Sequence, residues 1–98
     1  MDVKDYVIVR TYTMGVFAGE LVKKEGFEVT LKNARRLWYW SGAASLSQLA
    51  EDGTSDPKNC KFPKEVSEVI LTSPQGLEIL KVSTKGRESI SGVKIWEA

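Results

Sequence analysis

The sequence contains no histidine, a single cysteine and only three prolines among its 98 residues. Without histidine, the chain lacks the usual general base near neutral pH and the commonest metal ligand. Catalysis by a Ser-His-Asp or Cys-His arrangement is therefore excluded. Cys60 has no second cysteine with which to form an internal disulfide. This cysteine usage is typical of a protein in a reducing compartment, so we expect an intracellular protein.

Long apolar runs and excess charge are also missing. No apolar run approaches the roughly 18 residues that a membrane-spanning helix needs. The 14 basic and 13 acidic residues give a net charge of +1. This balance argues against bulk electrostatic binding to duplex nucleic acid or to an anionic membrane, but it is compatible with a local basic patch. The composition, 42% hydrophobic and 28% charged, indicates one globular domain over residues 1–98.

Short strands account for most of the chain. Strands are indicated by β-branched and aromatic residues, by alternation of apolar and polar residues, and by turn residues on either side. Glu25-Gly26 is a hairpin turn, and Asn33 marks a break or bulge. The predicted strands cover residues 6–12, 16–24, 27–32, 35–40, 66–72, 77–82 and 93–96.

One short helix is predicted over residues 45–51. Ser45 and Gln48 form a capping-box pattern at its start, and Gly53 can end it. Residues 52–65 form a long irregular connection, either functional or merely solvated, and residues 83–91 are ambiguous between a loop and a helical turn. We therefore expect an α+β, mainly β fold: a small antiparallel sheet, roll or barrel of about six to seven strands with one short helix.

Arginine and aromatic residues are densest between Asn33 and Trp40. In a strand, Arg36, Trp38 and Trp40 share one face, and Arg35, Leu37 and Tyr39 share the other. Rings can stack on a base while guanidinium groups bind phosphate, so the pattern suits a planar anionic ligand. The alternative is structural, since aromatic residues on a central strand are usually core and arginine stems often cover an apolar edge.

The segment that follows adds hydroxyl groups and the amides of a helix N-terminus, both of which can bind an anion. Arg10 joins this site if the first and fourth predicted strands are neighbours, although a solvent-exposed Arg10 is the favoured interpretation. The predicted ligand-binding residues are Arg35, Arg36, Trp38, Tyr39, Trp40, Ser41, Ser45, Ser47 and Arg10.

No catalytic residue, cofactor or metal site is predicted. Glu51, Asp52 and Asp56 lack the spacing of a calcium-binding loop, which favours solvated acids. Cys60 lies near Lys58 and Lys61, which could activate a thiol, but a half-buried thiol without a chemical role is the simpler interpretation.

The stretch Ala34-Arg35-Arg36-Leu37-Trp38-Tyr39-Trp40-Ser41-Gly42-Ala43-Ala44-Ser45-Leu46-Ser47-Gln48-Leu49-Ala50 resembles a family of small uncharacterised proteins of tailed phages and prophages. The segments Gly15-Val16-Phe17-Ala18-Gly19 and Cys60-Lys61-Phe62-Pro63 fit the same resemblance. It implies a protein of an infected bacterial cell, in the host cytoplasm, and brings no established activity or site. Small phage proteins of this kind often counter host defence.

Our leading hypothesis is a homo-oligomeric binding protein that sequesters a nucleotide-derived immune signal without cleaving it. Open strand edges in a small β domain favour self-association, and pockets shared between subunits bury more of a ligand. The alternatives are a protein-binding inhibitor of a host factor, with the same side chains as anchors, and a single-stranded nucleic-acid module. An enzyme is least favoured, because no catalytic set can be assembled from the spacing.

Overall fold

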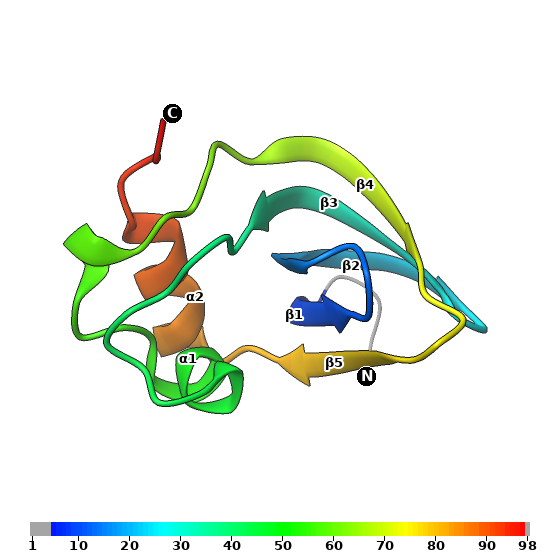
Figure 1. Ribbon diagram of the computed structural model, residues 1–98, viewed down its shortest axis with the longest axis horizontal. Helices are drawn as coiled ribbons and strands as arrows, with labels where there is room; N and C mark the ends of the chain where they lie inside the picture. The colour runs from blue at the N-terminus through cyan, green and yellow to red at the C-terminus, as the bar shows by residue number, and fades with distance from the viewer. Residues whose placement is uncertain (1–4, 98) are drawn as a thin grey trace.

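The computed structural model describes residues 5–97 and shows a five-stranded antiparallel sheet with two short α-helices at one end of it (Figure 1). This confirms the predicted α+β, mainly β class, with five strands instead of the expected six to seven. In chain order the elements are β1 (Tyr6–Thr11), β2 (Val16–Glu25), β3 (Glu28–Arg36), α1 (Leu46–Asp52), the 3-10 turn η1 (Pro57–Asn59), β4 (Val66–Thr72), β5 (Leu77–Lys81) and α2 (Thr84–Gly92).

The strand order is β4-β3-β2-β1-β5, so the last strand returns to pair with the first. The two edge strands, β4 and β5, converge at the turn that joins them (right in Figure 1). The concave face is lined by apolar side chains of all five strands, including Val9, Leu31 and Leu71, which are almost inaccessible to solvent. If the sheet were flat, this face would expose its apolar side chains to solvent. The curvature of the sheet brings the side chains of all five strands together and so encloses this part of the core.

A second core fills the space between the convex face and the helices. Ile8 and Ala18 of the sheet pack there with Leu49 of α1, Ile90 of α2 and Phe62 of the connection between β3 and β4. Burial of these side chains supplies the driving force that fixes both short helices, which would not be stable alone. The connection is thereby pinned to the body of the molecule, so its exposed side chains are presented on a fixed backbone.

Two predicted strands are wrong in extent. Residues 35–40 were expected to form one strand, but β3 ends at Arg36. The neighbouring strands begin only at Val16 (β2) and Val66 (β4), so residues 37–40 have no partner strand. Residues 93–96 form a single bridge, between Phe62 and Ile95, instead of a closing strand. The ambiguous segment 83–91 is helical, and Ser83 caps it by accepting a hydrogen bond from the amide of Gly86 at 2.9 Å.

The predicted bulge at Asn33 and the predicted cap and end of the first helix are confirmed, whereas the predicted position of Phe27 is wrong. Asn33 has a φ of 50° and lies where the register between β2 and β3 shifts, so it is the expected bulge. Ser45 caps α1 and Gly53 ends it with a φ of 78°. Phe27 belongs to the hairpin turn and is 58% exposed, although the alternation had placed it beside the buried Val29. Within residues 5–97, no helix is long and apolar enough to cross a bilayer.

Candidate functional site

The end of β3 and the turn between β1 and β2 form a groove of about 320 Å³, lined by Met14, Arg36, Trp38 and Trp40 among others. The Arg36 guanidinium lies 4.3 Å from the centre of the Phe17 ring and donates to the Met14 carbonyl at 2.8 Å. These contacts hold a half-exposed cation in place. Trp38 is 63% exposed, whereas Trp40 is half-buried and packs against the helix-side core. The groove therefore places an accessible ring and a fixed cation next to each other.

Beyond this groove, two remote segments extend the same surface. Tyr39 pairs with Lys61 in a short bridge, and the Trp96 amide donates to the Phe62 carbonyl at 3.1 Å. As a result the Lys61 ammonium lies between two rings, 5.8 Å from the centre of Tyr39 and 5.6 Å from that of Trp96. Both distances suit cation–π attraction. We call the set Arg36, Trp38, Tyr39, Lys61 and Trp96 the aromatic–cation surface.

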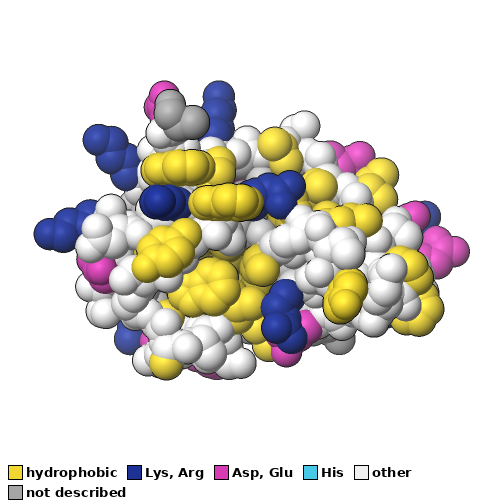
Figure 2. Space-filling model, in the orientation of Figure 1, with side chains coloured by type: hydrophobic (Ala, Val, Ile, Leu, Met, Phe, Trp, Pro, Cys, Tyr) yellow, Lys and Arg dark blue, Asp and Glu magenta, His cyan; other side chains and the backbone are white. Residues whose placement is uncertain are grey.

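Figure 2 shows this arrangement from outside: hydrophobic side chains with Lys and Arg side chains between them gather on the face over which the β3–β4 connection and the C-terminal segment run in Figure 1. Tyr39 is 51% and Trp96 37% exposed. Exposed rings grouped in this way are unusual on a soluble monomer and mark binding surfaces. The arrangement is an open ridge with hollows beside it, not a closed pocket.

Arg35, also a predicted ligand-binding residue, lies on the opposite side of β3 and is 6% exposed. Its guanidinium donates to the carbonyls of Phe62 (2.9 Å), Pro63 (3.0 Å) and Ile90 (2.7 Å). Burial lowers the pKa of Arg35 from its ordinary value, an effect that attraction to Tyr6 and Glu65 opposes. The geometry gives Arg35 a structural role, since it ties β3 to the connection and to the end of α2.

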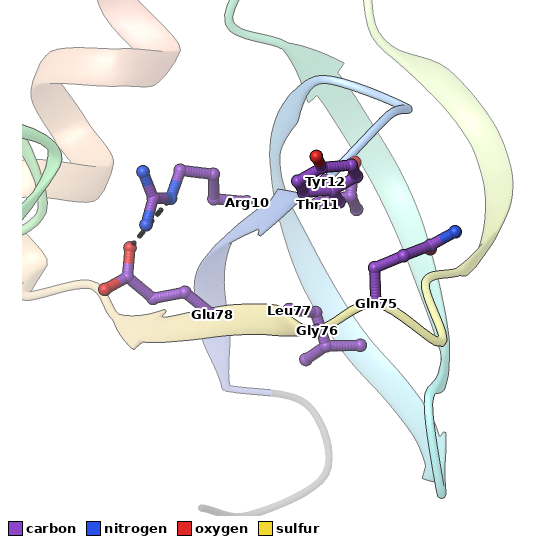
Figure 3. Close-up of a pocket in the computed structure, with 7 residues that line it drawn as sticks. All are labelled: Arg10, Thr11, Tyr12, Gln75, Gly76, Leu77 and Glu78. Carbon is purple, nitrogen blue, oxygen red and sulfur yellow. Dashed lines mark ion pairs between the residues drawn. The ribbon is translucent and has the colours of Figure 1, made fainter.

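Arg10 is likewise separate from the aromatic–cation surface. It lines a shallow pocket of about 380 Å³ between the end of β1 and the start of β5, where it forms an ion pair with Glu78 at 3.3 Å (Figure 3). Tyr12 and Gln75 line the same pocket from the two adjoining turns. Both partners of the ion pair are well exposed, so it contributes little to stability.

The predicted serines support the loop that carries the rings. Ser45 accepts a hydrogen bond from the Gln48 amide at 3.2 Å, and the Gln48 side chain in turn accepts one from the Ala44 amide at 2.6 Å. These two amides of the helix start are therefore engaged internally. Ser41 donates to the Asp56 carboxylate at 3.0 Å, while Ser47 is exposed on α1. In residues 5–97, no three His, Cys, Asp or Glu side chains are grouped so as to hold a metal ion.

Asp56 links this loop to η1. Hydrogen bonds from Asn59 and Ser41 lower the pKa of the Asp56 carboxyl, because both partners stabilise its charged form. A carboxyl whose pKa is lower in the folded state stabilises the fold above its unfolded pKa of about 3.9 and loses that contribution as pH falls through the folded value.

We therefore expect Asp56→Ala to lower the melting temperature at neutral pH. This effect should shrink as the pH falls below about 4 and through the lower pKa of the folded state, below which the carboxyl is protonated in both states. Thermal unfolding of the natural and variant proteins, followed by circular dichroism from neutral to strongly acidic pH, measures this difference. A difference that stays constant over the whole range would contradict the assigned role of the Asp56 charge.

A family model described as a domain of unknown function (DUF6948) matches residues 4–90. The chain belongs to the DUF6948 family. No curated protein and no solved structure matches the chain. Membership in an uncharacterised family agrees with the resemblance seen in the sequence, and it covers β1 through most of α2.

The sequence predicted Arg36, Trp38 and Tyr39 as candidate site residues, but it did not indicate that Lys61 and Trp96 lie beside them. In the sequence, Lys61 stands out only as one of the lysines near Cys60, and Trp96 only as the last residue of the predicted strand 93–96. Their place beside Tyr39 depends on two isolated bridges between segments far apart in the chain. No local pattern signals such pairing, although the lysines at positions 58, 61 and 64 could have drawn attention to this segment.

Proposed function

We propose that this protein binds a nucleotide-type ligand at the aromatic–cation surface and holds it without cleaving it. The observation that carries the proposal is the exposed Trp38 ring in the same groove as the fixed guanidinium of Arg36. A base stacks on an aromatic face regardless of its identity, and a guanidinium binds phosphate through paired donors. The non-catalytic part of the proposal rests on the absence of histidine from the sequence.

The biological setting of this proposal comes from the resemblance to phage and prophage proteins. In the cytoplasm of an infected bacterium, a protein that retains a nucleotide-derived immune signal would keep it from its receptor. Self-association fits this role, because β4 and β5 are edge strands whose outer backbone groups have no strand partner in the sheet. A homo-oligomer would raise the number of binding sites per particle and would bury more of each ligand.

Replacing Trp38 by alanine is expected to weaken binding of a nucleotide about tenfold or more, because stacking of one base is worth about 1–3 kcal/mol. Arg36→Gln should weaken the same binding through loss of the phosphate contact. Isothermal titration with ATP, GTP and a cyclic dinucleotide measures both effects without relying on tryptophan fluorescence.

The matched control is Phe27→Ala, which removes another exposed ring from the far hairpin and should leave affinity unchanged. Mass spectrometry of small molecules released on denaturation would identify a ligand retained from cells. If no nucleotide binds at millimolar concentration and none is released, the proposal is wrong. Recovery of one stoichiometric host protein instead would favour the alternative of a protein-binding inhibitor.

A further inference from the structure

Basic residues are frequent in the three segments that form the aromatic–cation surface. Three segments, residues 33–40, 57–64 and 92–96, hold six of the 14 basic residues, and only three acidic residues, Asp56, Glu65 and Glu97, directly flank them. The bridges of Tyr39 with Lys61 and of Phe62 with Ile95 bring these segments side by side. Apart from the buried Arg35, the basic side chains are Arg36, Lys58, Lys61, Lys64 and Lys94. The net charge of +1 is therefore compatible with a local excess of basic over acidic side chains on this surface.

The rings on this surface lie between two hollows. At one end is the groove of about 320 Å³ that contains Arg36 and Trp38. At the other is a hollow of about 430 Å³, lined by two lysines and one acid together with Trp96: Lys58, Lys94 and Glu97. Between them lie Tyr39 and Lys61. Since the bridged segments are each about 4.8 Å apart, the surface from Tyr39 to the C-terminal segment spans about 10 Å.

A single nucleotide could stack in one of these hollows alone. A second ring and further cations would then remain unused at the other end. A strand of several nucleotides can reach both hollows, with successive bases on separate rings and the intervening phosphates near Lys61. Alternating rings and cations on an open groove are the arrangement with which proteins bind single strands without sequence preference.

We propose that the ligand of the aromatic–cation surface is a single-stranded nucleic acid that lies across both hollows. This inference rests on the proposed function, because it uses the same base-stacking and phosphate contacts, and it narrows the ligand from a nucleotide to a strand. Trp38 and Trp96 provide the stacking positions at the two ends. Arg36 and Lys61 neutralise phosphates between them, and Lys58 and Lys94 extend the positive groove beyond Trp96.

Fluorescence anisotropy at low salt with end-labelled oligothymidylates tests this inference. Affinity should rise at least tenfold between a dinucleotide and a strand of about eight nucleotides, and then level off once the strand covers the surface. Affinity should also fall with salt, and Lys61→Gln should make the slope of log K against log[salt] shallower by about 0.7, the value for one phosphate contact on a single strand. Lys94→Gln provides a second variant with the same expectation.

Lys85→Gln, which removes an exposed lysine on α2 outside the aromatic–cation surface, is the matched control and should leave the salt slope unchanged. Circular dichroism verifies that each variant remains folded. Nucleotide binding without any gain from added length would overturn this inference and leave the proposed function standing. Absence of binding to both strands and nucleotides would overturn both. Length-dependent binding that Lys61→Gln and Lys85→Gln reduce equally would also count against the assigned surface.

Discussion

Arg35→Met is expected to lower the free energy of unfolding by about 3 kcal/mol or more, because hydrogen bonds to a charged group contribute about 1.5–3 kcal/mol each. The guanidinium supplies the donors for three carbonyls, those of Phe62, Pro63 and Ile90. Methionine keeps much of the aliphatic stem but leaves these carbonyls without that donor. A domain of this size is typically stable by only about 5–15 kcal/mol, so the loss is a large part of the total.

Urea unfolding followed by tryptophan fluorescence measures the effect. Arg36→Met is the matched control: Arg36 neighbours Arg35 in sequence but makes one exposed hydrogen bond, to Met14, so its replacement should cost about 1 kcal/mol or less. Arg35→Lys should be nearly as unstable as Arg35→Met, because an ammonium group cannot donate to three separate carbonyls in the way that a planar guanidinium group does. Equal losses for the Arg35 and Arg36 variants would refute the structural assignment of Arg35.

The contrast between these two arginines shows where sequence reasoning stopped. The alternation rule correctly put Arg35 and Arg36 on opposite faces of a strand. It could not say which face was enclosed, because both faces of this curved sheet carry apolar clusters. The guanidinium partners of Arg35 are backbone carbonyls about 27 or more positions away in the chain, and a sequence gives no signal of such contacts.

The strands were predictable where side-chain pattern and backbone pairing agree. β1 and β2 combine β-branched residues with flanking turns, and both were found within one residue at each end. Residues 37–40 have equally strong strand character, yet the neighbouring strands do not extend that far, so tertiary pairing overrides local preference. In this irregular segment the adjacent residues Trp38 and Tyr39 are both exposed.

α2 shows the opposite error: its residues were left ambiguous between a loop and a helical turn, but they form a helix. Its sequence contains Gly86 and Gly92, and glycine is unfavourable inside helices by about 1 kcal/mol. The helix forms because Ser83 caps it and Ile90 is buried in the helix-side core. Gly86 is accounted for by a contact that the sequence cannot reveal, since it lies against the backbone of Ala50 at the α1–α2 crossing.

That contact leads to the second large expected effect. A Cβ atom on Gly86 would overlap the carbonyl oxygen of Ala50 and lie 3.0 Å from a methyl group of Val82. The Ala50 carbonyl cannot easily retreat, because it also accepts hydrogen bonds from the Ser83 amide at 3.0 Å and hydroxyl at 3.2 Å. Gly86→Ala should therefore destabilise the protein by about 2–3 kcal/mol, an overpacking cost that exceeds the helix-propensity gain of about 1 kcal/mol.

Gly92→Ala is the matched control for Gly86→Ala, because it makes the same substitution in the same helix at a position where a Cβ would meet no atom within 4 Å. Only the propensity gain applies there, so Gly92→Ala should raise the melting temperature by a few degrees, whereas Gly86→Ala should lower it by about 10 °C. Differential scanning calorimetry of both variants measures the two shifts. Helix propensity alone would shift the melting temperature of both variants in the same direction. Shifts of the same sign would therefore show that α1 and α2 do not approach each other closely at Gly86.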